Sequence, residues 1–178
     1  MTPTKYTEPW THWIIDNFLS TECLYELKHI DNLVPQVLEG RRYGSDRLFI
    51  DDSNKEQYPE LYKLYQSLSN GEYRQFFETH TNQTFDGMYP RIEVISDIGE
   101  FSLTPHTDRK EKLLTAIVYT DHSKLYPGTA LSDTQRVESK DNRCFFFVPG
   151  DNTYHSYPLT NFETVRRCLH INYWTYTV

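Results

Sequence analysis

Two side chains that can bind a metal ion, His106 and Asp108, stand two residues apart at the end of a strand expected over 101–105. Side chains i and i+2 of a strand point to the same side, so this imidazole and this carboxylate can converge on one ion. Both are ligands that a divalent metal accepts, and a second histidine would complete a two-histidine, one-carboxylate site with open positions. The pair is therefore a candidate half of a metal centre.

The same spacing occurs at His29 and Asp31, which shows how little the pattern proves by itself. Apolar residues at three- and four-residue steps predict a helix over this segment. Helical residues two positions apart are separated by about 200° around the axis, so these two side chains diverge. We expect both of them on the surface.

His155 is the candidate for the second histidine ligand. It follows the apolar run 144–148, which predicts a buried strand over 143–149. A side chain placed just after a buried strand lies at the mouth of a sheet sandwich. The aromatic residues 145–147 within the run are expected in the core rather than along a substrate surface. The remaining histidines without comparable partners, His12, His80 and His122, are expected on the surface.

Arg166 comes eleven residues after His155, in a strand expected over 164–176. Alternation places Arg166 on a polar face of that strand, whereas Arg167 shares its face with Leu169 and Ile171. If the apolar face packs on helices, Arg166 points into the interior of the sandwich. A buried guanidinium needs an anion, and its fork suits a carboxylate, so a carboxylate-bearing ligand beside the metal is the natural partner. Arg167 is kept as the alternative anchor.

A neighbouring strand, expected over 112–120, offers two more polar groups. Alternation places Thr115 and Tyr119 on one face, together with Leu113 and Ile117. The Tyr119 hydroxyl could therefore reach the carboxylate that Arg166 is expected to bind.

The elements that must position these residues change in character along the chain. Helices are expected from Ser20 to Pro35, from Pro59 to about residue 68, and around 73–77. Short β-branched and aromatic runs then predict strands over 88–96, 101–105, 112–120, 129–132, 143–149, 152–156 and 164–176. The fold class is α+β, mostly β: a jelly roll or sandwich with N-terminal helices packed on one sheet. We expect a single domain over 1–178, with helical support over about 1–86 and a β-core over about 87–176.

Two polar segments are candidates for shaping the entrance of a pocket. Residues 40–58 are expected to form a long polar loop or short strands, and Arg41, Arg42 and Arg47 lie either in solvent or in a substrate lid. Residues 132–141 are polar throughout and are a candidate mobile loop.

Composition excludes several classes of protein. The 18 Lys and Arg against 25 Asp and Glu give a net charge of -7, which argues against a nucleic-acid partner. No apolar run approaches the roughly 20 residues of a membrane-spanning helix, and no secretory signal is readable. Three separated cysteines without a CxxC pair favour a reduced, cytoplasmic protein.

The ordered set of His106, Asp108, His155 and Arg166 resembles the iron and 2-oxoglutarate dependent dioxygenases, in particular their prolyl-hydroxylase-like branch. The resemblance covers about residues 87–176. Four further segments match that branch in order, and a fifth resembles its usual N-terminal start: 113–119, the glycine-containing turn and strand 127–131, 142–149, the final strand ending in Trp174, and 17–20.

This resemblance implies a double-stranded β-helix in which the two histidines and Asp108 hold Fe(II). Arg166 would bind the distal carboxylate of 2-oxoglutarate with help from Tyr119 and Thr115, and O2 would be the second co-substrate. The implied reaction releases succinate and CO2 and hydroxylates a peptidyl (prolyl-type) or small-molecule substrate. The carboxylate of Asp108 favours hydroxylation over halogenation, because halogenases of this superfamily lack it.

The sequence also departs from the family. Many relatives carry a tyrosine about ten residues before the first ligand, where this chain has Ser96-Asp97-Ile98-Gly99. His170 stands where relatives often have Thr or Ser, and it either lines the pocket or is a hydrogen-bonded core histidine. Two alternative functions remain. One is a non-catalytic binding or sensor module on the same scaffold. The other is a cupin-type metal enzyme, although cupins typically use an HxH pair.

Overall fold

The computed structural model describes residues 2–31, 33, 43–120 and 127–175, and most of the regular structure in it is β. In chain order the elements are β1 (Thr4–Tyr6), β2 (His12–Asp16), α1 (Thr21–Lys28), β3 (Tyr43–Ile50), α2 (Pro59–Asn70), α3 (Glu72–Thr81), β4 (Tyr89–His106), β5 (Lys112–Tyr119), β6 (Thr129–Ala130), β7 (Arg136–Val137), β8 (Arg143–Phe147) and β9 (His155–Trp174).

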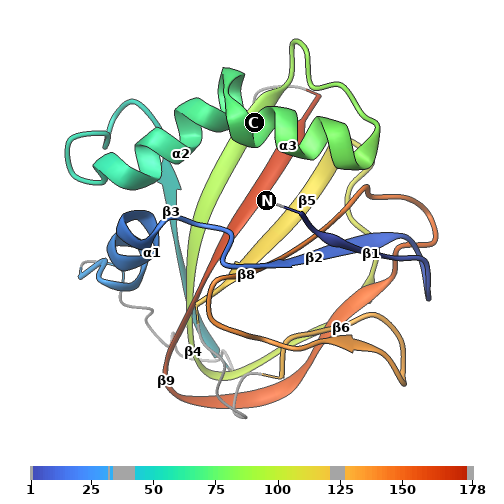
Figure 1. Cartoon of the computed structure of the whole chain (residues 1–178). Coiled ribbons are helices and arrows are strands. Elements are labelled where there is room, and N and C mark those ends of the chain that lie inside the picture. Colours follow the sequence, from blue (N-terminus) through green and yellow to red (C-terminus); the bar gives the residue numbers. More distant parts are fainter. Residues whose placement is uncertain (1, 32, 34–42, 121–126, 176–178) are drawn as a thin grey trace.

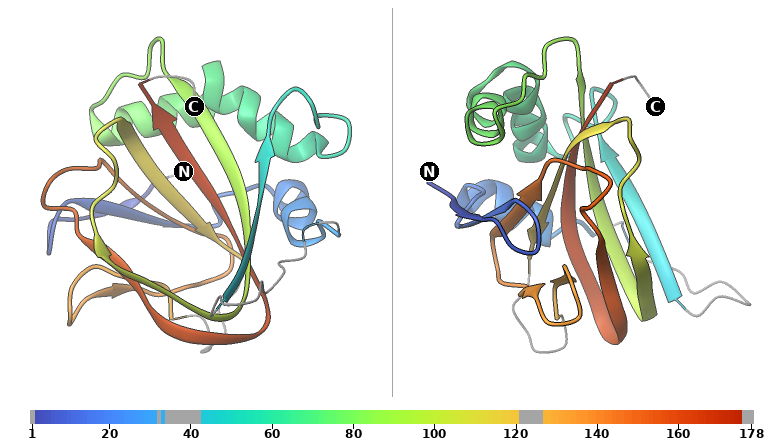
Figure 2. Two further views of the ribbon diagram at one scale, coloured as in Figure 1. Left: turned by 180° about the vertical axis from the view of Figure 1, so that it is seen from behind. Right: turned by 90° about the vertical axis from the view of Figure 1, so that its right-hand side faces the viewer.

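One antiparallel sheet in the order β1-β2-β8-β5-β9-β4-β3 forms the main body of the protein (Figure 1). Its two long strands, β4 and β9, stay paired over most of their length and bend together away from the sheet (Figure 2). Their pairing shifts register between Asp97 and Gly99, where Gly99 adopts a φ of 79° that an L side chain rarely takes. Beyond it, β9 pairs with β6, and β6 pairs with β7. The sheet thus curls into the expected jelly roll.

The helices cover one face of the main sheet, as the sequence predicts (Figures 1 and 2). Leu27 of α1, Leu61 and Leu68 of α2 and Phe77 of α3 are buried in one cluster with sheet residues such as Leu169. Burying such side chains contributes about 1.5–3 kcal/mol each, so this layer holds the helices on the sheet.

The first helix is shorter than expected. It begins after the N-cap Ser20, whose hydroxyl accepts a hydrogen bond from the Cys23 amide, and it ends at Lys28. Ile30 and Leu33 are still buried in the helix-side cluster. Burial therefore continues beyond the end of the helix, and residues 34–35 at the expected end lie outside the described part of the chain.

Several strands differ from the sequence-based expectation. β1 and β2 were not predicted, and β3 is a regular eight-residue strand where a loop or short strands were expected. The pairs of strands expected over 88–96 and 101–105, and over 152–156 and 164–176, are the continuous bent strands β4 and β9. The segment 132–141 contains β7. Short-range patterns mark strand termini poorly where a bulge interrupts the alternation.

Alternation on β9 and β8 is confirmed. Leu169 and Ile171 pack on the helix side, whereas Cys168 belongs to a second cluster inside the curl. Phe145 and Phe147 also lie in that second cluster, and Phe146 packs towards the helices.

Two expectations about individual residues were wrong. Leu113 packs against the helix-side cluster, because a register shift between Lys112 and Leu114 breaks the alternation of β5. His12 is buried, where its Nδ1 lies 2.9 Å from the Trp10 carbonyl oxygen and its ring stacks on Tyr6. The missed strands β1 and β2 create that environment.

The other two histidines expected on the surface gave different outcomes. His80 is half-buried, and its Nδ1 lies 2.7 Å from the Phe76 carbonyl oxygen. His122 lies outside the described residues.

Within the described part of the chain, no helix is long and apolar enough to cross a membrane.

Candidate metal centre

The three predicted metal ligands come together where the bent ends of β4 and β9 meet. His106 ends β4, His155 begins β9, and the two residues are paired directly across the strands. Asp108 follows His106 by two residues. One ligand atom from each side chain lies within 4.8 Å of the other two. They form the one such group of three or more potential metal ligands found among the described residues.

Each histidine ring is oriented by its own strand. Nδ1 of His106 lies 2.9 Å from the carbonyl oxygen of Thr104, and Nδ1 of His155 lies 3.0 Å from that of Thr153. These bonds assign the Nδ1–H tautomer to both rings and leave Nε2 as the ligand atom. The two carbonyls lie two residues before their histidines, so the local chain itself provides the orientation.

The Asp108 carboxylate is held by two neighbours on β5. Lys112 Nζ lies 2.8 Å from Oδ1, and the Thr115 hydroxyl donates to Oδ2 at 2.7 Å. Thr115 Oγ1 also lies 3.2 Å from Oδ1 of Asn172 on β9. Residues of the adjacent strands β5 and β9 therefore fix the position of this carboxylate.

Protonation of these groups also suits a metal. Burial alone would raise the pKa of the Asp108 carboxyl, but Lys112 and Thr115 lower it below its ordinary value. Burial lowers the pKa of His155, which favours its neutral form. An ionised carboxylate and neutral imidazoles are the states in which these side chains bind a metal. The donor set thus fits Fe(II) bound by two histidines and one carboxylate.

The metal ligands open into a cavity of about 670 Å³ that Arg166 also lines. The Arg166 side chain is buried beside Tyr157, and its guanidinium carbon lies 4.6 Å from the centre of that ring. Its Nη1 lies 2.6 Å from Oδ2 of Asp97, which lines the same cavity from β4. The predicted anchor therefore faces the predicted interior, but it already has an anionic partner.

Arg167 points the other way, as the alternation of β9 predicts. Its guanidinium donates to the backbone carbonyls of Lys28 and Leu33 and to the Ser96 hydroxyl. These contacts tie β9 to the end of α1 and to the chain after it. Arg167 is not among the residues that line the cavity.

The two other predicted co-substrate residues occupy different places. Thr115 lines the cavity and contacts Asp108. Tyr119 is fully buried, and its hydroxyl lies 2.6 Å from the Thr129 hydroxyl, which does line the cavity. Tyr119 thus supports the cavity wall through Thr129.

Sequence reasoning did not assign Lys112, Asn172, Glu93 and Asp97 to this cavity, whereas lining the pocket was one of its two alternatives for His170. Simple alternation places Leu113, not Lys112, on the cavity side of β5. Only the register shift between Lys112 and Leu114 shows that Lys112 lines the cavity instead. Asn172 and the half-buried His170 follow from the face of Arg166, and His170 lines the cavity. Alternation on β4 would have placed Glu93 and Asp97 together, yet nothing in the sequence shows that Asp97 stands opposite Arg166.

At the rim of the cavity, Arg47 on β3 is exposed and bonds the buried Glu93 at 2.8 Å. Arg91 also pairs with Glu93, at 2.9 Å. Arg47 therefore belongs to the wall of the pocket. Arg41 and Arg42 lie outside the described residues.

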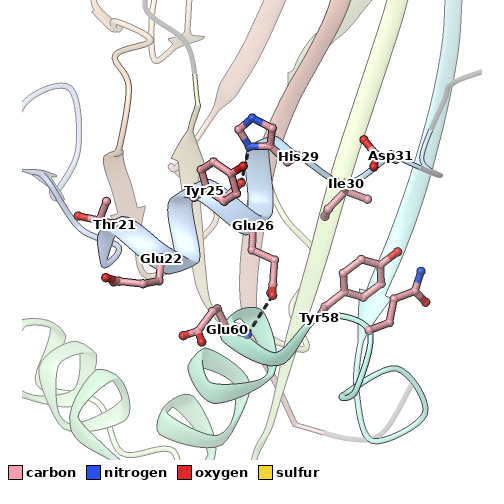
Figure 3. A pocket seen from close by; sticks show the side chains of 10 residues that line it. Thr21, Glu22, Tyr25, Glu26, His29, Ile30, Asp31, Tyr58 and Glu60 are labelled. Carbon is pink, nitrogen blue, oxygen red and sulfur yellow. Dashed lines mark hydrogen bonds between the residues drawn. The ribbon is translucent and has the colours of Figure 1, made fainter.

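The second His-x-Asp pair lies in a groove between α1 and α2 (Figure 3). The His29 ring stacks on Tyr25, with 4.1 Å between ring centres, while the Asp31 carboxylate lies beyond the end of the helix on the other side of Ile30. Glu26 in the same groove accepts hydrogen bonds from the backbone amides of residues 60 and 61 at the start of α2. As expected, the two side chains diverge and are exposed.

Solved structures with a similar fold include prolyl hydroxylases and a member of the 2OG-Fe(II) oxygenase family. The viral collagen prolyl hydroxylase of Paramecium Bursaria Chlorella virus-1, in a 2OG complex, has a TM-score of 0.61 and 15% identity, over 93% of this chain and 96% of that one. HygX from Streptomyces hygroscopicus, with nickel and 2-oxoglutarate bound, has a TM-score of 0.60 and 10% identity, over 92% and 82%. A prolyl hydroxylase from Trichoplax adhaerens, in complex with a hypoxia inducible factor peptide fragment, has a TM-score of 0.55 and 16% identity, over 92% and 83%.

No protein-family model matches the chain, and neither does any curated protein. At identities of 10–16% the structural likeness establishes the fold. The chain has the mostly β jelly-roll fold of prolyl hydroxylases and other 2OG-Fe(II) oxygenases, as the sequence resemblance predicts.

Proposed function

We propose that this protein is an Fe(II)- and 2-oxoglutarate-dependent dioxygenase that hydroxylates a peptidyl (prolyl-type) or small-molecule substrate. The observation that carries the proposal is one cavity holding a two-histidine, one-carboxylate group together with a buried arginine from the same sheet. A fold of this size needs neither feature to be stable. The three metal ligands suit a divalent metal ion, and the arginine suits a carboxylate of an oxo-dicarboxylic acid. We assign the activity to one domain over 1–178.

His106, Asp108 and His155 would hold the metal ion. Lys112 and Thr115 keep the carboxylate ionised and oriented before any metal arrives. A bound Fe(II) supplies the oxidising chemistry with O2, which no side chain of the protein can supply. The protein contributes the ligand positions, a cavity partly closed to water, and anchoring groups for the organic molecules.

Arg166 is the proposed anchor for the distal carboxylate of 2-oxoglutarate, since a planar guanidinium binds a carboxylate through paired hydrogen bonds. Thr115 and Tyr119 assist, Thr115 in the cavity and Tyr119 through Thr129. Oxidation of the co-substrate would give succinate and CO2.

The prime substrate would enter from the rim formed by Arg47, Glu93 and the outer part of β4. Two of the structural neighbours named above are prolyl hydroxylases, one of them in complex with a peptide, which supports a peptidyl substrate. HygX supports the wider class, because its structure holds nickel and 2-oxoglutarate on the same fold.

The test is an anaerobic titration with Fe(II) and then 2-oxoglutarate, followed by admission of air. We expect a weak visible charge-transfer band from the chelate and then succinate formation. The chain supplies a matched pair of variants: His106→Ala should abolish both signals, whereas His29→Ala, from the other His-x-Asp pair, should leave them intact. Absence of both signals in the wild type would contradict the proposal. A band without succinate would favour the binding or sensor module.

A further inference from the structure

The anchor of the proposed co-substrate site is an ion pair rather than a lone cation. Asp97 on β4 stands directly across from Arg166 on β9, and Asp97 Oδ2 lies 2.6 Å from Arg166 Nη1. Exposure of the two side chains is 1% for Asp97 and 9% for Arg166. Water therefore screens the pair very little, and each charge strongly affects what the other can bind.

The second oxygen of the same carboxylate is incompletely satisfied. Asp97 Oδ1 is buried and has no hydrogen-bond partner among the described residues. Buried carboxylate oxygens are nearly always hydrogen-bonded, so Asp97 keeps an unsatisfied acceptor beside the cavity, and a second carboxylate, itself an acceptor, cannot satisfy it. Asp97 and Arg166 both line the cavity that holds the metal ligands.

Another buried carboxylate of β4 shows the contrast. Glu93 is four residues earlier on the same face; its Oε2 accepts a hydrogen bond from Arg47, and its Oε1 forms an ion pair with Arg91. Glu93 is thus already paired with two arginines other than Arg166. Asp97 is therefore the carboxylate that pairs with Arg166, the proposed anchor. It lies in the segment where many members of the resembled family have a tyrosine.

A second carboxylate approaching Arg166 would meet a neutral pair. The distal carboxylate of 2-oxoglutarate would gain the guanidinium but also face Asp97 at close range, and like charges in a buried site repel. A 2-oxo acid without that distal carboxylate would avoid the repulsion.

We propose that Asp97 is a specificity-determining residue that competes with the distal carboxylate of 2-oxoglutarate for Arg166 and weakens the preference of this site for dicarboxylic over monocarboxylic 2-oxo acids. The inference rests on the proposed function. It adds to that function a statement about the co-substrate: the site distinguishes poorly between dicarboxylic and monocarboxylic 2-oxo acids.

The experiment measures binding rather than turnover. Protein loaded with Mn(II) is titrated with 2-oxoglutarate or with 2-oxovalerate, which lacks the distal carboxylate, and the Kd values are compared by calorimetry. In the wild type we expect the two values to differ by less than about tenfold. In Asp97→Asn, which removes the charge and keeps the size, 2-oxoglutarate should bind about tenfold or more tightly and 2-oxovalerate should change little. Glu93→Gln is the matched control and should leave the ratio of the two Kd values unchanged.

Two results would overturn the inference alone: a wild-type preference for 2-oxoglutarate above about a hundredfold, or a ratio that Asp97→Asn leaves unchanged. The wild-type measurement decides the question even if the variant does not fold. If the Mn(II)-loaded wild type bound neither acid, the proposed function itself would fail.

Discussion

The two ends of the cavity are organised in opposite ways. At the metal end, carbonyls only two residues away orient the two histidines and leave Nε2 of each available, while Lys112 and Thr115 each bond one oxygen of Asp108. At the other end, Arg166 is held by Asp97, a partner 69 positions away in the sequence that occupies the very group a ligand would need. The metal end is preorganised, whereas the arginine end has an internal competitor. We therefore expect the metal ion to find its site ready to bind, whereas the carboxylate of the organic ligand must compete with Asp97 for Arg166.

The largest effect should come from breaking the metal end. Asp108→Ala removes the one carboxylate ligand, and we expect iron-dependent succinate formation to fall by about a thousandfold or more. Mn(II) binding, followed by electron paramagnetic resonance, should be lost with it. Asp31→Ala, from the other His-x-Asp pair, serves as the control; an equal loss there would mean that the triad is not the site.

The arginine end should be weakened without loss of the metal. Arg166→Ala should raise the 2-oxoglutarate concentration needed for half-maximal turnover by about tenfold or more, because a charge-assisted bond is removed. Mn(II) affinity should stay within about twofold of wild type. If Arg167→Ala gave this result instead, the assignment of the two arginines to opposite faces would be incorrect.

Preorganisation of the metal end can be tested through Thr115. Thr115→Val keeps the shape but removes the hydroxyl that donates to Asp108, and we expect Mn(II) to bind about tenfold more weakly. Thr115→Ser should restore most of the affinity. Equal Kd values for wild type and Thr115→Val would show that Lys112 alone positions the carboxylate.

Arg167 provides a structural counterpart on the opposite face. Arg167→Ala removes hydrogen bonds to two backbone carbonyls and the Ser96 hydroxyl, and should lower Tm by about 2–4 °C. The Kd for 2-oxoglutarate should not move. A changed Kd with an unchanged Tm would instead assign Arg167 to the binding site.

The smallest effect concerns pH. Burial first, and then Lys112, Arg166 and Arg47, lower the pKa of His170 well below its ordinary value of about 6.5. The unfolded chain therefore binds a proton more readily than the folded one, so His170 contributes stability that is lost as pH falls below about 6.5. Tm of the metal-free protein should fall on acidification from pH 7.5 to 5.5, and less steeply in His170→Gln. An identical slope in the two proteins would rule out His170 as a contributor.

Local pattern was sufficient for much of the candidate site. Alternation put His106 with Asp108 and separated Arg166 from Arg167, because strand geometry assigns faces regardless of what lies beyond them. The same reasoning separated His29 from Asp31; the structure confirms their separation, although α1 ends at Lys28, before both residues. The helix-side core was likewise readable from the spacing of apolar residues.

Interruptions of the pattern were not readable. The register shift before Leu114 exchanged Leu113 for Lys112 in the cavity, and the strand β2 buried His12. A bulge depends on pairing with strands that are distant in sequence, and the burial of one histidine depends on elements packed around it. Neither leaves a signature in the few residues around the position.

By itself, the sequence determined the mostly β class, the three ligand types and the strand faces that carry them, because these follow from side-chain chemistry and a two-residue period. Only the tertiary structure decided that β4 and β9 bend together, so that His106 meets His155 and Asp97 meets Arg166. The physical reason is that contacts between strands are fixed by register, and register is set by packing over the entire sheet. The internal competitor for the arginine therefore became visible only when the two strands were aligned.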